Sequence, residues 1–107
     1  MPYGLNDTEI QLMRKVLEQY PEVKQAILYG SRAKGNYRPA SDIDLTLVGT
    51  ALTLTHLPEI ENQLDDLMLP YKIDLSLFSA IESTALLEHI KRVGLVLYEQ
   101  VNGWRDF

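Results

Sequence analysis

The chain has 107 residues, 46% of them hydrophobic and 23% charged, which predicts one globular domain over residues 1–107. A formal net charge of −5 argues against extended nucleic-acid binding, which needs a broad basic surface. The chain has no cysteine, which excludes a disulfide, a thiolate metal site and a thiol nucleophile. We recognise neither a signal peptide nor a membrane-spanning stretch, and therefore expect a cytoplasmic protein with no membrane partner.

The first third of the chain predicts a helix, a strand and a short helix. Apolar residues at helical spacing favour a helix that ends before Pro21. An apolar run then predicts a buried strand over residues 23–29, followed by a turn that leads into a short helix over residues 30–35. The candidate N-caps of the first helix, with Glu9 or Gln11 placed for a capping box, are Asn6, Asp7 and Thr8.

The remaining elements alternate between strands and helices. A second strand is predicted over residues 42–48, and residues 50–57 are compatible with either a short strand or a loop. Pro58 is typical of the first residue of a helix, which ends before Pro70. The fold class is therefore α/β or α+β, with a small mixed sheet flanked by about four helices. The later predictions are a strand over residues 72–78, a helix with a capping box from Ser79 to Glu82 and Gly94 at its C′ position, an edge strand over residues 95–99, and a polar-aromatic tail over residues 102–107.

Two aspartates open the predicted second strand. Residues i and i+2 of a strand point to the same face about 6.6 Å apart, so Asp42 and Asp44 present their carboxylates side by side. Such a pair repels unless a cation lies between the two groups. Mg²⁺ is typically held by one or two carboxylates together with water and substrate phosphates, so the pair predicts a site for Mg²⁺ or Mn²⁺. The alternative is that Asp42 only forms the turn that precedes the strand.

A glycine and a serine follow the predicted first strand. Such a pair lets the backbone approach a phosphate closely, and the N–H groups of a following helix start point at the anion. Gly30 and Ser31, with the basic residues Arg32, Lys34 and Arg38 close behind, therefore predict a site for a nucleoside triphosphate. The alternative is an ordinary strand-ending turn followed by a solvated basic loop.

Gly30-Ser31, ten intervening residues and Asp42-Ile43-Asp44 resemble the signature of the DNA polymerase beta nucleotidyltransferase superfamily. Such a short chain resembles in particular the minimal nucleotidyltransferases (MNT), the MntA-like adenylyltransferase antitoxins that are paired with HEPN-domain toxins. The resemblance extends from the first predicted helix to residues 95–99. In this family a third carboxylate lies on a strand beside the Asp-x-Asp strand, and Asp74 matches that position.

The resemblance implies that AMP is transferred from ATP to a hydroxyl, expected to be a tyrosine, of a partner HEPN ribonuclease toxin. Asp42, Asp44 and Asp74 would be the catalytic and metal-binding residues, with Asp74 also helping to deprotonate the attacking hydroxyl. Gly30 and Ser31 would hold the β- and γ-phosphates. Arg32 is expected to contact a phosphate or the partner.

Three other functions stay open. The chain could neutralise its toxin by binding alone, or modify a small molecule such as an aminoglycoside with a helical partner subunit. It could also be a regulatory module that binds ATP without turnover. His56 and His89 lie far from the aspartates in the sequence, and neither has metal-ligand spacing to another histidine, so we expect a structural role for both.

Overall fold

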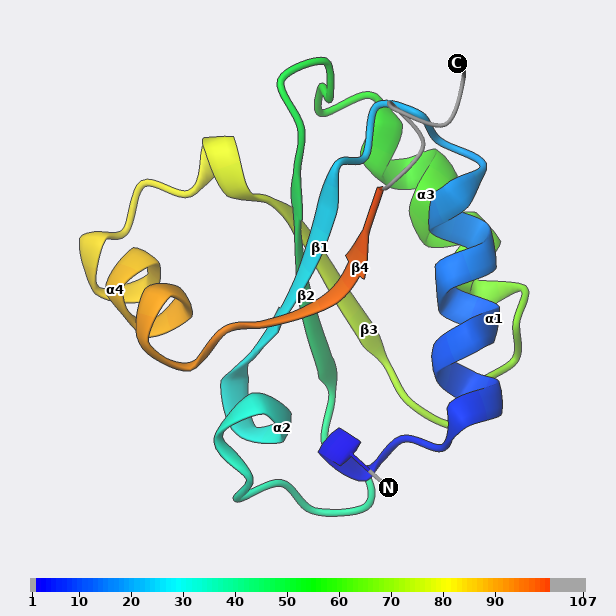
Figure 1. Cartoon of the computed structure of the whole chain (residues 1–107), viewed down its shortest axis with the longest axis vertical. Helices are drawn as coiled ribbons and strands as arrows, with labels where there is room; N and C mark the ends of the chain where they lie inside the picture. The colour runs from blue at the N-terminus through cyan, green and yellow to red at the C-terminus, as the bar shows by residue number, and fades with distance from the viewer. Residues whose placement is uncertain (1, 101–107) are drawn as a thin grey trace.

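The computed structural model describes residues 2–100 and contains a mixed four-stranded sheet (Figure 1). The strands lie in the order β3-β2-β1-β4. β1 pairs antiparallel with both β2 and β4, whereas β2 and β3 are parallel. The predicted mixed sheet is confirmed, and the prediction of one domain over residues 1–107 stays a prediction. The strands are β1 (Gln25–Tyr29), β2 (Ile43–Val48), β3 (Ile73–Leu77) and β4 (Leu95–Glu99).

Two helices, α1 (Asp7–Glu18) and α3 (His56–Asp65), cover one face of the sheet (Figure 1). α1 begins with a capping box, because the Asn6 side chain accepts the Glu9 N–H at 2.7 Å while Glu9 Oε1 accepts the Asn6 N–H at 3.0 Å. The core lies between these helices and the strands, where burial of apolar side chains supplies most of the driving force for folding. Its fully buried members include Met13, Leu17, Leu28, Leu45, Ile60 and Leu64.

The other helical elements lie at the opposite side of the sheet and at one of its ends. α2 (Gly30–Lys34) follows β1 directly, and α4 (Thr84–Val93) stands beside β1 (Figure 1). Short 3-10 turns, η1 (Pro2–Gly4) and η2 (Phe78–Ala80), complete the described elements. No helix within residues 2–100 is both long enough and apolar enough to cross a membrane.

The structure corrects several predicted boundaries. Ser83, not Ser79, caps α4 by accepting the Leu86 N–H at 3.2 Å, because the chain from residue 78 to 80 instead turns as η2. Gly94 is not left-handed, with φ at −60°. A Cβ on Gly94 would collide with the Ile90 carbonyl oxygen and with Ile27, so the glycine is required by close packing.

Other boundaries move by a few residues. β1 begins at Gln25 instead of residue 23, and α3 begins at His56, two residues before Pro58. His56 Nδ1 accepts the Thr53 N–H at 3.0 Å, which supports an earlier start of that helix. Residues 49–55 form turns without a strand. The predicted tail at residues 102–107 lies outside the described residues.

Candidate functional site

Two of the predicted acids are direct neighbours across the parallel strands. Asp44 of β2 is in register with Asp74 of β3, so both side chains lie on the same face of strands about 4.8 Å apart. Asp42 precedes β2 by one residue and lies two positions from Asp44. Asp42 and Asp74 are exposed, whereas Asp44 is half-buried. The sheet therefore brings the three predicted carboxylates to one end of adjacent strands.

The proximity of the three carboxylates changes the pKa of Asp44. Burial raises the pKa of the Asp44 carboxyl above its ordinary value of 3.8, the carboxylates of Asp74 and Asp42 raise it further, and His89 opposes the shift. The charged form of Asp44 is therefore less favourable in the folded chain than it is for an aspartate in water. A cation between these carboxylates would relieve that cost.

Whether this site can hold a metal ion depends on the type and the number of ligand atoms that its side chains supply. Within residues 2–100, no group of three or more histidine, aspartate or glutamate side chains is gathered closely enough to hold a metal by itself. The carboxylate oxygens of Asp42 and Asp44 are nevertheless hard donors, and Mg²⁺ is usually bound by one or two carboxylates completed with water and substrate phosphates. The residues present therefore suit a magnesium ion that arrives together with a triphosphate.

Gly30 lies against the Asp44 carboxylate. Tyr29 and Asp44 are in register across β1 and β2, and the chain turns into α2 at the next residue. Gly30 has a φ of +76°, and a Cβ at this position would overlap Asp44 Oδ2. Only glycine satisfies both requirements. The predicted phosphate-binding residues Gly30 and Ser31 thus lie beside the predicted metal-binding residues.

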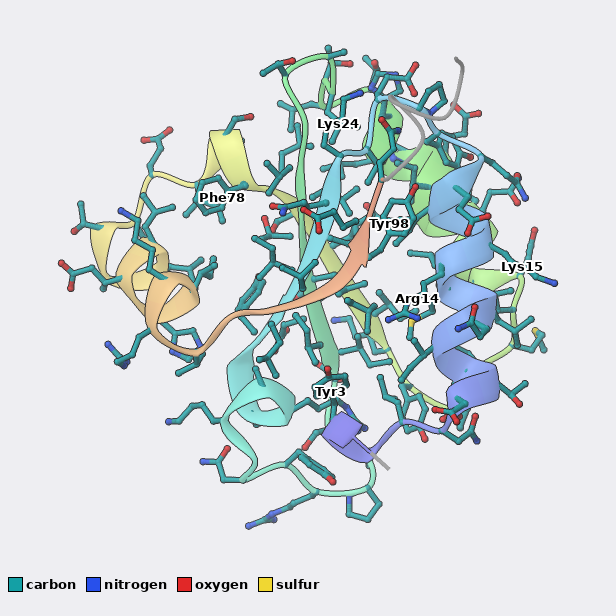
Figure 2. The ribbon with its side chains drawn as sticks, viewed as in Figure 1. Tyr3, Arg14, Lys15, Lys24, Phe78 and Tyr98 are labelled. Atoms are coloured by element: carbon teal, nitrogen blue, oxygen red, sulfur yellow. The ribbon has the colours of Figure 1, made fainter. Side chains whose placement is uncertain are left out.

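Arg32 is buried, with 2% of its surface exposed. Its Nε and Nη2 donate to the Ser41 carbonyl at 3.1 and 2.8 Å, and Nη2 also donates to the Pro39 carbonyl at 3.2 Å. Nη1 donates to the Tyr3 carbonyl at 2.9 Å, and Tyr3 lies next to α2 in Figure 2. All three guanidinium nitrogens therefore bind backbone carbonyls, two of them in the loop that leads to Asp42.

Two aromatic rings flank the Arg32 guanidinium. Its central carbon lies 5.3 Å from the centroid of the Tyr37 ring and 4.6 Å from that of Tyr71. Cation–π contacts of this kind compensate in part for the desolvation of a buried charge. The predicted phosphate contact of Arg32 stays a prediction, while the observed contacts tie the loop before β2 to α2 and to the N-terminal turn.

His89 is a site residue that the sequence analysis missed. Its Nε2 accepts the Gly30 N–H at 3.1 Å, and its ring meets the Tyr29 ring edge-on with centroids 6.2 Å apart. One signal was available, because His89 lies three residues after Leu86 and four before Val93, on the inward face of the helix. His56, in contrast, lies at the start of α3 near Glu22, as expected for a structural residue.

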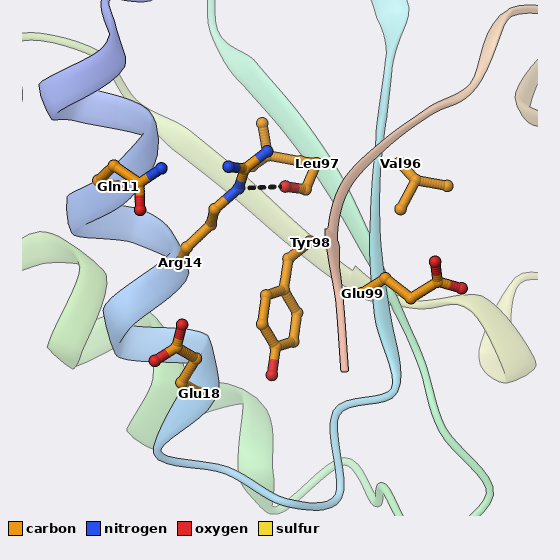
Figure 3. A pocket seen from close by; sticks show the side chains of 7 residues that line it. All are labelled: Gln11, Arg14, Glu18, Val96, Leu97, Tyr98 and Glu99. Atoms are coloured by element: carbon orange, nitrogen blue, oxygen red, sulfur yellow. Dashed lines mark hydrogen bonds between the residues drawn. The ribbon is translucent and has the colours of Figure 1, made fainter. Parts of the chain in front are cut away.

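A groove of about 520 Å³ lies elsewhere, between α1 and the edge strand β4 (Figure 3). The Arg14 side chain crosses this groove, and its Nε donates to the Leu97 carbonyl at 2.7 Å. The hydrogen bond satisfies a backbone carbonyl of the edge strand. The groove is separate from the predicted site, because the two share no residue. Its lining residues are Gln11, Arg14, Glu18, Val96, Leu97, Tyr98 and Glu99.

The sequence model of the family described as "Polymerase beta, Nucleotidyltransferase" matches residues 11–102. The chain belongs to the polymerase beta nucleotidyltransferase family. The predicted superfamily and the predicted nucleotidyltransferase fold are thereby confirmed. None of the curated proteins compared with this nucleotidyltransferase matches it.

Solved structures with a similar fold include chains of toxin–antitoxin complexes. One is a toxin–antitoxin with AMP-PNP, at 24% identity and a TM-score of 0.69, over 95% of this chain and 77% of that one. A second is a tri-AMPylated Shewanella oneidensis HEPN toxin in complex with an MNT antitoxin, at 19% identity and a TM-score of 0.67, over 90% and 74%. A putative nucleotidyltransferase from Sulfolobus solfataricus is more distant, at 14% identity and a TM-score of 0.52, over 87% and 82%.

Proposed function

We propose that this nucleotidyltransferase is an MNT-type antitoxin that transfers AMP from ATP to a hydroxyl, expected to be a tyrosine, of a partner HEPN toxin. The observation that carries the proposal is the register of Asp44 and Asp74, with Gly30 against Asp44 and Asp42 two residues before it. The similar complexes support the partner and the reaction, since one contains AMP-PNP and another a tri-AMPylated HEPN toxin with an MNT antitoxin.

In the proposed reaction, the hydroxyl oxygen of the acceptor forms a bond to the α-phosphorus of ATP while the bond from that phosphorus to pyrophosphate breaks. Asp42 and Asp44 would hold the metal, which neutralises charge on the triphosphate. Asp74 is exposed and would accept the proton of the attacking hydroxyl. Most of the acceleration would come from positioning and from electrostatic stabilisation.

The phosphates would lie at the start of α2. Ser31 supplies a hydroxyl donor there, and the first backbone N–H groups of a helix lack partners within the helix. Gly30 keeps the space between this turn and Asp44 free of a side chain. For Arg32 we propose a supporting role in place of a phosphate contact, because all three of its nitrogens already donate to carbonyls.

The test is intact-mass spectrometry of the chain, its partner and both together after incubation with ATP and Mg²⁺. We expect a mass gain of one or more AMP units on the partner, and none with the double variant Asp42→Ala/Asp44→Ala. The matched control is Asp65→Ala/Asp66→Ala, which removes two exposed carboxylates at the end of α3 and should leave the transfer unchanged.

Other outcomes would select another function. A stable complex with unmodified partner would support neutralisation by binding alone. Modification of an aminoglycoside by the two-chain complex would support a small-molecule acceptor. Toxin neutralisation that persists undiminished in Asp42→Ala/Asp44→Ala would contradict a catalytic antitoxin.

A further inference from the structure

Helix α4 contributes one polar contact to the turn at which the proposed nucleotide site is built. The Gly30 N–H donates to His89 Nε2 at 3.1 Å, across 59 residues of sequence. The His89 ring also packs edge-on against Tyr29, the last residue of β1, with an interplanar angle of 80°. The hydrogen bond involves the peptide between Tyr29 and Gly30, and the ring contact involves the side chain of the residue on its N-terminal side.

The orientation of this peptide decides where α2 begins. Gly30 has a φ of +76°, and glycine in the left-handed region can reorient at little steric cost. The hydrogen bond to His89 opposes that freedom by fixing the direction of the Gly30 N–H. Ser31 is the next residue, so the directions of its hydroxyl and amide groups depend on the conformation of Gly30.

The same turn also lies against the metal-binding edge. A side chain on Gly30 would overlap Asp44 Oδ2, so small rotations at this residue change the space beside that carboxylate. His89 on α4 therefore acts on the turn that separates the proposed phosphate-binding residues from Asp44.

We propose that His89 is a positioning residue for nucleoside triphosphate binding, which holds the Tyr29–Gly30 peptide so that the Ser31 hydroxyl meets the phosphates. The inference rests on the proposed function, because it assigns the phosphates to that turn. It requires Nε2 to be the acceptor, so the proton of the neutral ring lies on Nδ1.

The test compares His89→Leu with His89→Gln in the full chain. Leucine removes the acceptor, whereas the end of a glutamine side chain can place an amide oxygen near the position of Nε2. We expect His89→Leu to weaken binding of AMP-PNP with Mg²⁺ by about three- to tenfold, the range of one hydrogen bond, and His89→Gln to recover most of that loss. With the partner present, the KM for ATP should rise more than kcat falls.

Two further measurements separate positioning from folding. Nitrogen-15 NMR of the free chain should show the Nδ1–H tautomer of His89, and the Gly30 amide should exchange with solvent faster in His89→Leu. The matched control is His56→Leu, which removes the other histidine at the start of α3 and should leave AMP-PNP affinity unchanged.

Equal AMP-PNP affinity in wild type and His89→Leu, or failure of glutamine to recover any affinity in a folded variant, would overturn the inference. A wild-type chain that binds AMP-PNP but never transfers AMP would overturn the proposed function alone. The binding comparison would then still decide the role of His89.

Discussion

The surroundings of Asp44 disfavour the negative charge that its carboxyl group carries when it is ionised. It is half-buried, it is in register with Asp74, and Asp42 lies two residues away. Each feature raises the pKa of its carboxyl and so disfavours the charged form. Residues that destabilise a fold in this way are common where a ligand later supplies the missing charge. Asp44 therefore connects the stability of the chain to the proposed chemistry.

We expect Asp44→Asn to raise the melting temperature of the metal-free chain at pH 7 by a few degrees, since about 1 kcal/mol corresponds to about 4–8 °C in a domain of this size. The folded chain holds the Asp44 proton more tightly than the unfolded chain, so its stability falls as pH rises from 3.8 through the raised pKa. The advantage of asparagine should therefore vanish below pH 3.8. Differential scanning calorimetry across this pH range measures it.

The control for this prediction is Mg²⁺ with AMP-PNP, which should stabilise the wild-type chain more than Asp44→Asn. A variant that is less stable than wild type at pH 7 without metal would contradict the proposed repulsion.

At the scale of elements, the short helix α2 and the loop before β2 are joined through Arg32. Its guanidinium reaches the carbonyls of Ser41, Pro39 and Tyr3, and so connects α2, the loop and the N-terminal turn. Ser41 immediately precedes Asp42. The direction in which Asp42 leaves the loop therefore depends on a side chain ten positions earlier.

We expect Arg32→Met to destabilise the chain by about 2–4 kcal/mol, because four part-buried hydrogen bonds to backbone carbonyls are lost while the apolar stem is kept. Urea unfolding measures this free energy. Arg38→Met is the matched control on the exposed loop and should change it by less than about 0.5 kcal/mol. Arg32→Met should also weaken binding of the metal–nucleotide complex, through misplacement of Asp42. A stable Arg32→Met chain with lowered nucleotide affinity would favour a direct phosphate contact instead.

On the scale of the whole molecule, the sheet has two different faces. α1 and α3 cover one face, where the core lies (Figure 1). The other face bears the half-buried Asp44 and the exposed Asp74. The net charge of −5 makes a wide contact with nucleic acid unfavourable. This charge agrees with the proposed protein acceptor.

We expect no measurable binding of the chain to transfer RNA or single-stranded RNA at physiological salt, because a net charge of −5 repels the phosphate backbone. Fluorescence anisotropy with labelled RNA checks this, and AMP-PNP binding under the same conditions is the positive control. Micromolar RNA affinity would contradict the expectation and would point to a nucleic-acid acceptor.

The spacing of Gly30, Ser31, Asp42 and Asp44 was enough to indicate the family. The mixed sheet could also be predicted from the sequence, because strand periodicity and turn chemistry are local properties. The resemblance also pointed to Asp74, but its register with Asp44 could not be predicted from the sequence. That register and the contact of His89 with Gly30 depend on strand pairing and helix packing between residues far apart in the chain. The burial of Arg32 likewise depends on carbonyls and aromatic rings from separate segments, which its position in the sequence does not reveal.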